Sequence, residues 1–304
     1  PSLSSAVMVA ARSELALGLR SARKYAAVNG GVLIVAWLVT SIDWAVHSCT
    51  ASPLASPLAS AALGTAVLYA LVYRICAANL FDRRPIFAEK RLPAIPLMAL
   101  IWHPLGAMLE RMLHGSGLCA PSAVAAVSEL LPGWLLPRAF NWYGGLVLRL
   151  LAFELTYDFF FYWAHRMAHA HPLVYRVVHK LHHAHTHDVR ILSALQMGPL
   201  DVLLTHTLPV LGALAIIPLA PGFEYNVGKT YLLFQEFYGH AGVENRGRNF
   251  GPAPWLARAL DVELRSEDHQ RHHIRADVNF SKRFSLWDRL FCTWSAAERG
   301  GKQH

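Results

Sequence analysis

The 304-residue sequence has few charged residues, and this shortage limits the kinds of protein that it can encode. Only 16% of the residues are Asp, Glu, Lys or Arg, whereas soluble domains average roughly 25%. Hydrophobic residues make up 54% of the chain, and the mean hydropathy is positive. The composition therefore disfavours a water-soluble domain and indicates a protein surrounded mainly by lipid.

Cysteine is also scarce. The four cysteines, Cys49, Cys76, Cys119 and Cys292, are far apart and form no C-x-x-C pair. This pattern disfavours a disulfide framework or a zinc knuckle and indicates a reducing compartment.

The sequence has no nucleic-acid-binding motif, internal repeat or low-complexity tract. The net charge of +8 suits nucleic acid or an anionic membrane. Because the chain is so hydrophobic, we expect the membrane and no nucleic-acid partner.

Residues 1–27 are rich in Ser and Ala and carry four basic residues against one acid, Glu14. No cleavable signal peptide is evident, which leaves an amphipathic surface helix or an organellar transit segment. The helix is favoured because basic residues commonly flank a first span. Residues 28–304 are then expected to form a single membrane-embedded domain.

Long apolar runs predict an all-α membrane bundle. They occupy residues 28–46, 58–80, 93–113 and 142–163, and two shorter runs, 202–220 and 225–239, are predicted as spans or as a re-entrant hairpin. We therefore expect four to six spanning or re-entrant helices.

Charge asymmetry predicts which side of the membrane each end of the helices faces. The segment between the first two runs has no Lys or Arg, whereas residues 81–92 contain four. Basic flanks favour the cytoplasm, so runs three and four would return the chain to that side at His165. Residues 241–304 carry eleven Lys and Arg, and we expect them to form a cytoplasmic helical cap.

Three histidine clusters carry the chemical signal. They are His165-x3-His169, His179-x2-His182-His183 and His269-x2-His272-His273. Residues three and four apart share one face of a helix, so each cluster is predicted to aim two or three ring nitrogens at one point. Imidazole binds iron, zinc and copper well.

The number of imidazoles indicates two metal ions. The clusters supply eight, and His240 is a plausible ninth, whereas one zinc ion takes four ligands. H-E-x-x-H is absent, since Arg166 follows His165, which argues against a metalloprotease. E-x-x-H, typical of soluble di-iron bundles, is also absent.

Two rival classes remain open. One is a metal transporter or a non-catalytic zinc-binding membrane protein, although a transporter should hold its ligands near the middle of its spans. The other is bis-histidine haem ligation, which needs only two of the nine histidines.

The motifs and their flanking residues resemble the sterol desaturase/fatty acid hydroxylase superfamily over about residues 145–295. The resemblance rests on Asp158-Phe-Phe-Phe-Tyr-Trp-Ala-His165-Arg-Met-Ala-His169, on the two H-x2-H-H clusters, and on Leu286-Trp-Asp-Arg-Leu-Phe291. It implies a membrane-bound, non-haem di-iron oxygenase in which the eight clustered histidines are metal ligands. His240 joins them as the ninth predicted ligand.

The resemblance also implies two iron ions as cofactor, O2 as co-substrate, and hydroxylation or desaturation of a sterol-like or fatty-acyl lipid, with hydroxylation slightly favoured. Some relatives carry a second histidine where this chain has Glu244, which argues against a tenth ligand. No cytochrome b5-like domain is evident, so a separate cytochrome b5-like or ferredoxin-type donor is expected. We expect the protein in the bacterial inner membrane or the endoplasmic reticulum rather than in another organellar membrane.

Asp158 lies in an apolar run, where a carboxylate is costly and usually functional. We predict that it accepts a hydrogen bond from a ligand histidine of another helix; the alternative is an ion pair with Arg149 or another buried cation. The aromatic residues 159–163 are predicted either to line the lipid entrance or to form an interfacial belt. The remaining histidines are interpreted as ordinary: His47, His103, His114, His171, His185, His187, His206 and His304.

Overall fold

The computed structural model describes residues 3–49, 55–80, 99–115, 138–186, 189–243 and 249–296. The regular secondary structure of these residues is helical, and an isolated antiparallel bridge joins Glu263 and Phe284. This confirms the predicted all-α class. The basic segment 81–92, together with Cys119, His187, Glu244 and His304, lies outside the described residues.

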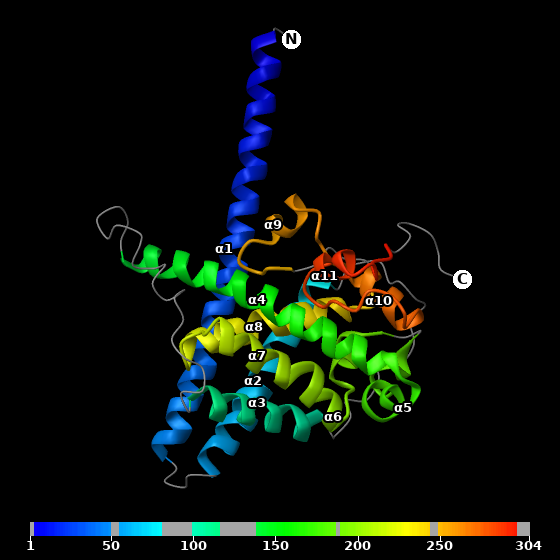
Figure 1. The fold of residues 1–304 in the computed structure, drawn as a ribbon. Helices are drawn as coiled ribbons and strands as arrows, with labels where there is room; N and C mark the ends of the chain where they lie inside the picture. Colours follow the sequence, from blue (N-terminus) through cyan, green and yellow to red (C-terminus); the bar gives the residue numbers. More distant parts are fainter. Residues whose placement is uncertain are drawn as a thin grey trace.

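Two long helices begin the bundle. Helix α1 (Leu3–Cys49) packs along α2 (Ala55–Leu80), and its N-terminal half extends well beyond the other helices (Figure 1). Helix α3 (Ala99–Gly115) lies against α2, and α8 (Phe223–Gly239) contacts both α1 and α2. Helices α1, α2 and α3 thus pack in order along the chain, and α8 packs against α1 and α2.

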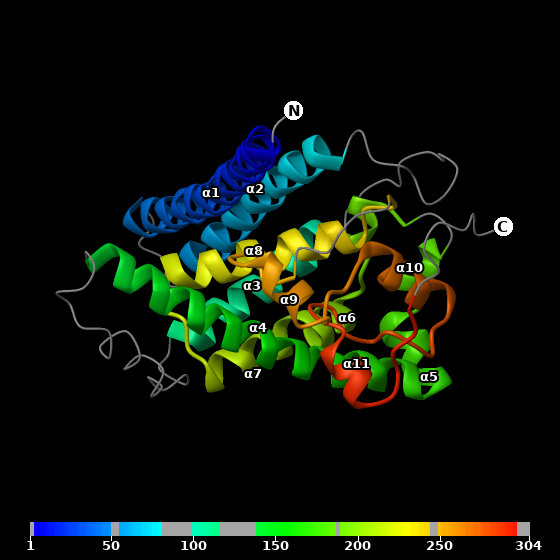
Figure 2. The same cartoon turned by 90° about the horizontal axis from the view of Figure 1, so that it is seen from above.

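A second layer contains the long helix α4 (Arg138–Ala170). It packs on a continuous helical rod made of α6 (Pro199–Asp201), the π-helical segment η5 (Val202–Thr207) and α7 (Leu208–Ile216). π-helical turns are rare and often mark functional sites. Figure 2 shows α4 and α7 on one side of α8, with α1 and α2 on the other.

Three helical segments are long and apolar enough to cross a membrane: Tyr25–Cys49, Ser56–Ala78 and Pro199–Ile216. They correspond to the predicted runs 28–46, 58–80 and 202–220. Large apolar side chains on these helices face outward, including Trp37 and Trp44. Lipid is the solvent that such a surface suits.

Charged side chains inside the bundle are paired. Arg111 of α3 contacts Asp43 of α1, Lys229 of α8 contacts Glu110 of α3, and Arg149 of α4 contacts Glu224 of α8. Pairing offsets much of the cost of removing these charges from water. Each pair also joins two helices that are distant in sequence.

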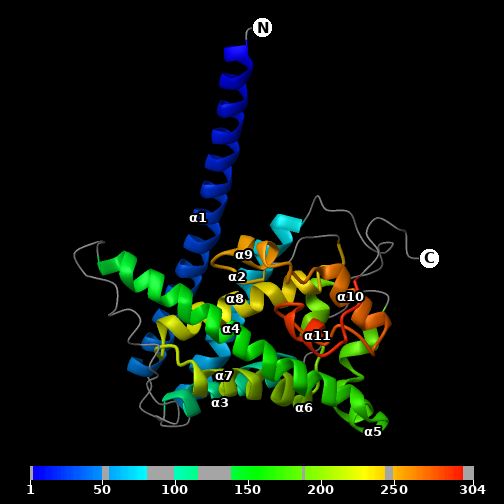
Figure 3. The same cartoon turned by 45° about the horizontal axis from the view of Figure 1, so that its top comes forward.

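Short elements gather at one end of α4 and form a cap (Figure 3). They are α5 (Pro172–Val174), η2 (Tyr175–His179), η3 (His182–His185), η4 (Ile191–Leu195), α10 (Ser266–Ile274) and α11 (Leu286–Leu290). Helix α9 (Pro254–Ala259) lies nearer the middle of α4. The histidine clusters lie on this cap and on the adjoining ends of α4 and α8.

Candidate metal centre

All nine predicted histidines come together in two adjacent groups. Ring nitrogens within each group lie within 4.8 Å of one another. One group contains His165, His169, His179, His183 and His272, and the other contains His182, His240, His269 and His273. We call them the five-histidine group and the four-histidine group.

The groups do not follow the sequence clusters. His165 and His169 stay together, but the adjacent His182 and His183 belong to different groups. His272 is likewise separated from His269 and His273. In each H-x2-H-H cluster two of the three rings therefore share one group, as predicted, and the third ring belongs to the other group. Neighbouring residues on a helix point about 100° apart, so each cluster bridges the two groups.

Facing imidazole nitrogens lie unusually close. Nε2 of His165 is 2.9 Å from Nε2 of His179, and Nε2 of His183 is 3.1 Å from Nε2 of His272. In the four-histidine group, Nε2 of His269 lies 3.1 Å from Nε2 of His240 and 3.2 Å from Nε2 of His273. Nitrogens that converge in this way suit a shared cation.

The opposite nitrogens of several rings are anchored. Nδ1 of His165 donates to the Phe280 carbonyl at 2.7 Å, Nδ1 of His272 to the Val278 carbonyl at 2.7 Å, and Nδ1 of His240 to the Glu236 carbonyl at 2.9 Å. A proton on Nδ1 leaves the lone pair on Nε2. These anchors give the tautomer and orientation that a metal ligand needs.

Burial favours the neutral form of His169, His183, His240 and His272. It lowers the pKa of His169 to about 3, that of His240 to about 3 and that of His183 to about 2, and neighbouring histidines lower the pKa of His169 and His183 further. The pKa of His272 is lowered for the same two reasons. Neutral imidazole is the form that binds metal.

Asp201 contacts the five-histidine group. Both of its carboxylate oxygens lie 3.0 Å from Nδ1 of His179, and the Thr205 hydroxyl donates to the same carboxylate at 3.1 Å. This is the carboxylate–histidine pair expected beside a metal. Sequence analysis missed Asp201, although a lone acid at the start of an apolar run is a signal for such a residue.

The prediction for Asp158 was wrong. Asp158 accepts hydrogen bonds from the backbone N–H groups of Lys282 and Arg283, both at 2.8 Å, and of Phe284 at 3.0 Å. The alternative pair with Arg149 is wrong too, since Arg149 contacts Glu224 at 2.6 Å. The chain segment after α10 crosses α4 at Asp158, so this carboxylate binds a loop where an imidazole was predicted.

A buried ion pair borders the four-histidine group and was also missed from sequence. Nζ of Lys282 lies 2.9 Å from Oε1 of Glu236 and 3.3 Å from Nε2 of His269. The same Oε1 is 3.2 Å from Nδ1 of His240. The pair thus links α8 to the loop that Asp158 holds.

The aromatic stretch 159–163 packs mainly against α11. Ring centroids are 5.0 Å apart for Phe159 and Trp287, 5.0 Å for Trp163 and Phe291, and 5.2 Å for Tyr162 and Phe291. These contacts hold the cap on α4. They give the stretch a packing role that neither sequence interpretation anticipated.

The other histidines differ in their surroundings. His171 is exposed, and its ring accepts a hydrogen bond from the Leu173 N–H. His103 and His206 are neighbours at a cavity, with ring centroids 5.9 Å apart. His114 is buried, and neither ring nitrogen has a hydrogen-bond partner among the described residues. None of these four belongs to the two histidine groups.

These features define a class: an all-helical, membrane-type protein with a buried polyhistidine cluster at one end. Residues 150–293 match the family model described as fatty acid hydroxylase. With the relatives below, this match supports the resemblance of the chain to the sterol desaturase/fatty acid hydroxylase superfamily.

Several curated relatives align with about half of this chain. A fatty acid hydroxylase of Lecanicillium is 27% identical over 50% of this chain and 43% of its own length. The C-4 methylsterol oxidase of Schizosaccharomyces pombe is 29% identical over 49% of this chain and 47% of its own length. The human alkylglycerol monooxygenase is 31% identical over 47% of this chain and 29% of its own length. The aligned part thus spans less than half of each of these relatives. No solved structure matches the chain significantly.

Proposed function

We propose that this protein is a membrane-bound, non-haem di-iron oxidoreductase that uses O2 to hydroxylate or desaturate a lipid. The observation that carries the proposal is the convergence of nine imidazoles, eight of them buried, into a group of five and a group of four. The activities that the relatives are named for, on fatty acids, methylsterols and alkylglycerols, support lipid oxidation as the reaction class.

The donor set fits iron better than zinc or magnesium. Every ligand candidate is an imidazole nitrogen, which suits iron, copper, nickel and zinc but not the oxygen-seeking magnesium and calcium. A zinc ion takes four ligands, so the five-histidine group offers more than zinc uses. Bound iron would supply the one-electron and O2 chemistry that breaks an unactivated C–H bond.

The protein's own contribution is positioning and exclusion of water. Carbonyls of Phe280, Val278 and Glu236 orient three of the rings, and Asp201 orients His179. Eight of the nine rings are buried in the cap. The outward-facing apolar helices keep the site next to the membrane, where a lipid substrate is dissolved.

The proposal includes the wider arrangement of the chain. Residues 1–27 would form a basic leading segment, and residues 28–304 one catalytic domain. The cap would face the cytoplasm, on a bacterial inner membrane or the endoplasmic reticulum. A separate protein of cytochrome b5 or ferredoxin type would deliver electrons to the buried site.

Metal analysis and lipid analysis together test the function. The full chain, purified from membranes of a producing host, should carry about two iron atoms. Host lipids should contain a new species that has gained one oxygen or lost two hydrogens, and growth under isotopically heavy O2 should mark the oxygenated product. His183→Ala should lose iron and product, whereas the exposed His171→Ala should keep both.

Other outcomes would contradict the proposal. Tightly held zinc with ion flux in proteoliposomes would support a transporter or a zinc-binding protein. An intense Soret absorption band would support haem ligation. If the protein carried iron but left the lipids of several different hosts unchanged, the proposed reaction would be rejected and the metal centre retained.

A further inference from the structure

A buried lysine lies beside the four-histidine group. Lys282 belongs to the loop that Asp158 holds, and it is only 4% exposed. Its Nζ lies 2.9 Å from Oε1 of Glu236, 3.3 Å from Nε2 of His269 and 3.5 Å from Nδ1 of His240. A buried ammonium is costly unless its charge and its hydrogens have partners. These three contacts therefore decide what the ammonium can do.

Only one of the three contacts can accept a hydrogen from Lys282 when a metal is bound. Nδ1 of His240 donates to the Glu236 carbonyl at 2.9 Å, so it carries a proton and has no free lone pair. Nε2 of His269 lies 3.1 Å from Nε2 of His240 and 3.2 Å from Nε2 of His273, and a metal takes the lone pair that it offers there. Within the described part of the chain, Oε1 of Glu236 is the acceptor that remains. Two of the three ammonium hydrogens then have no protein acceptor.

The two histidine groups differ in ways that favour an added ligand at the four-histidine group. The five-histidine group has one more imidazole, and Asp201 places a carboxylate behind His179. The four-histidine group has instead an ammonium next to a metal-facing nitrogen. A metal ion and an ammonium repel each other, and an anion that contacts both removes this repulsion. The expected ligand of this group is therefore negatively charged.

There is space for a small ligand beside the ammonium. Glu236 and Lys282 line a cavity whose volume, about 30 Å³, is that of one or two water molecules. An anion of two or three atoms fits a space of this size, whereas a lipid does not. The ligand expected here is therefore small as well as anionic.

We propose that Lys282 holds a small anion beside the metal of the four-histidine group by donating hydrogen bonds to it. Glu236 positions the ammonium and limits its net charge. O2 gains negative charge when the electron-donor protein reduces it, so the same ammonium would stabilise the reduced co-substrate of the proposed function. The assignment rests on the metal centre of that proposed function, but anion binding itself requires neither a lipid nor turnover.

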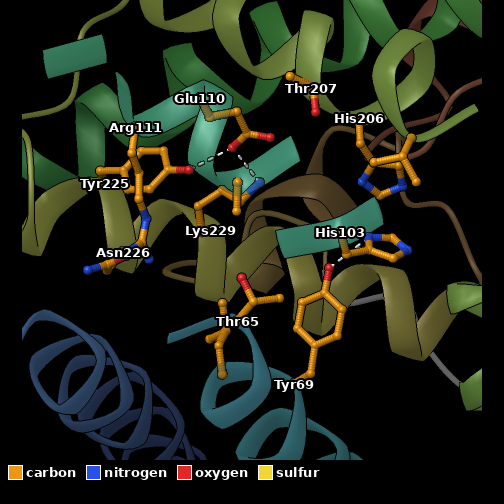
Figure 4. A pocket seen from close by; sticks show the side chains of 13 residues that line it. Thr65, Tyr69, His103, Glu110, Arg111, His206, Thr207, Tyr225, Asn226 and Lys229 are labelled. Carbon is orange, nitrogen blue, oxygen red and sulfur yellow. Dashed lines mark hydrogen bonds and ion pairs between the residues drawn. The ribbon is translucent and has the colours of Figure 1, made fainter. Parts of the chain in front are cut away.

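A second lysine–glutamate pair supplies a matched control. Lys229 of α8 contacts Glu110 of α3 at 2.7 Å inside the bundle, and the Tyr225 hydroxyl donates to the same carboxylate at 2.6 Å (Figure 4). Among the described residues, the hydrogen bonds and ion pairs of these two side chains involve none of the nine histidines. Changes at this pair show what the loss of a largely buried ion pair does by itself.

Azide binding without turnover tests the assignment. The full chain, purified from membranes with its iron and then oxidised, is titrated with azide, and the azide-to-iron charge-transfer absorption gives the dissociation constant. Combining Glu236→Gln with Lys282→Met replaces the pair by uncharged side chains of similar size. This double variant should keep its iron and bind azide about 10- to 100-fold more weakly, which is the equivalent of one charge-assisted hydrogen bond.

Two further variants separate anion binding from stability. Combining Glu110→Gln with Lys229→Met should leave the azide affinity like that of the parent protein. Glu236→Gln alone leaves the Lys282 ammonium uncompensated, so this variant should bind azide more tightly than the parent, and azide should raise its melting temperature more. A purely structural role of the pair predicts weaker azide binding here too. If the single variant does not fold, the two double variants decide.

Several results would overturn the assignment. The double variant at Glu236 and Lys282 could keep its iron and bind azide like the parent, or the control at Glu110 and Lys229 could weaken azide binding equally. Loss of iron from the first double variant would mean that the pair holds the metal site and not its ligand, and a parent that binds iron but no azide would also contradict the assignment.

The same measurements distinguish this assignment from the proposed function. A parent protein without iron would reject the proposed function and the assignment with it. A parent that binds iron and azide through Lys282 but oxidises no lipid would reject the proposed reaction alone. A parent that oxidises lipid, with an azide affinity independent of Lys282, would reject the assignment alone.

Discussion

Asp201 holds Nδ1 of His179 between its two carboxylate oxygens, each 3.0 Å away, at the edge of the five-histidine group. The pair fixes the ring and adds negative charge behind a candidate ligand. Replacing Asp201 by Asn should weaken metal binding to this group about 10- to 100-fold. Competition with a chelator measures the affinity, and unaltered affinity would show that the carboxylate has no influence on the metal.

Asp158 should matter more for stability than for metal affinity. Its carboxylate accepts three backbone N–H groups from residues 282–284, and Asp158→Asn removes the charge and places amide hydrogens beside those donors. We expect a loss of about 2–4 kcal/mol in the free energy of unfolding. Thermal melts in micelles measure it, and a variant as stable as the parent but poor in iron would contradict this assignment.

The buried pair of Glu236 and Lys282 offers a double-mutant test. Glu236→Gln leaves the Lys282 ammonium without its carboxylate, which should cost about 3–5 kcal/mol. Combining it with Lys282→Met removes the unpaired charge and should recover much of that stability. If the two single effects simply add, the residues are not coupled and the 2.9 Å contact has no energetic role.

Acid should destabilise the metal-free protein. The folded-state pKa of His169 and of His240 is about 3, while an unfolded histidine titrates near 6.5. The unfolded chain therefore takes up protons first, and stability is lost as the pH falls from about 6.5 toward about 3, at up to about 1.4 kcal/mol per pH unit for each such histidine. Melting temperatures of the metal-free protein measured across this pH range test the prediction, because they should fall as the pH falls.

Bound metal competes with these protons, so a metal-loaded sample should keep its stability to lower pH than the metal-free one. Equal acid sensitivity of the two samples would mean that the histidine groups do not bind the added metal.

Gly242 is needed two residues after His240. Its φ is +66°, and a Cβ at this position would collide with the Val189 carbonyl oxygen. Gly242→Ala should therefore cost about 2–4 kcal/mol and lower metal occupancy of the four-histidine group. Gly144→Ala is the control, because a Cβ there meets nothing within 4 Å. Equal stability of the two variants would contradict the packing argument.

Much of the fold could be predicted from apolar length. The runs 28–46, 58–80 and 202–220 correspond to helices that can span a membrane, because only a helix satisfies its backbone within hydrocarbon. The role of Asp158 could not be predicted, since its partners come from residues 282–284, which are about 125 positions away in the chain. Sequence spacing carries no information about a loop that arrives from so far.

The histidine spacing alone singled out eight of the nine residues of the two histidine groups, because imidazoles three or four positions apart on a helix share a face whatever lies opposite. The tertiary structure decided how they divide. His182 and His183 adjoin in sequence but lie in different groups, since each ring joins whichever imidazoles α4, α8 and α10 bring to its side. The same packing placed His103, which its sequence context makes unremarkable, at a polar cavity between α2, α3, η5 and α8.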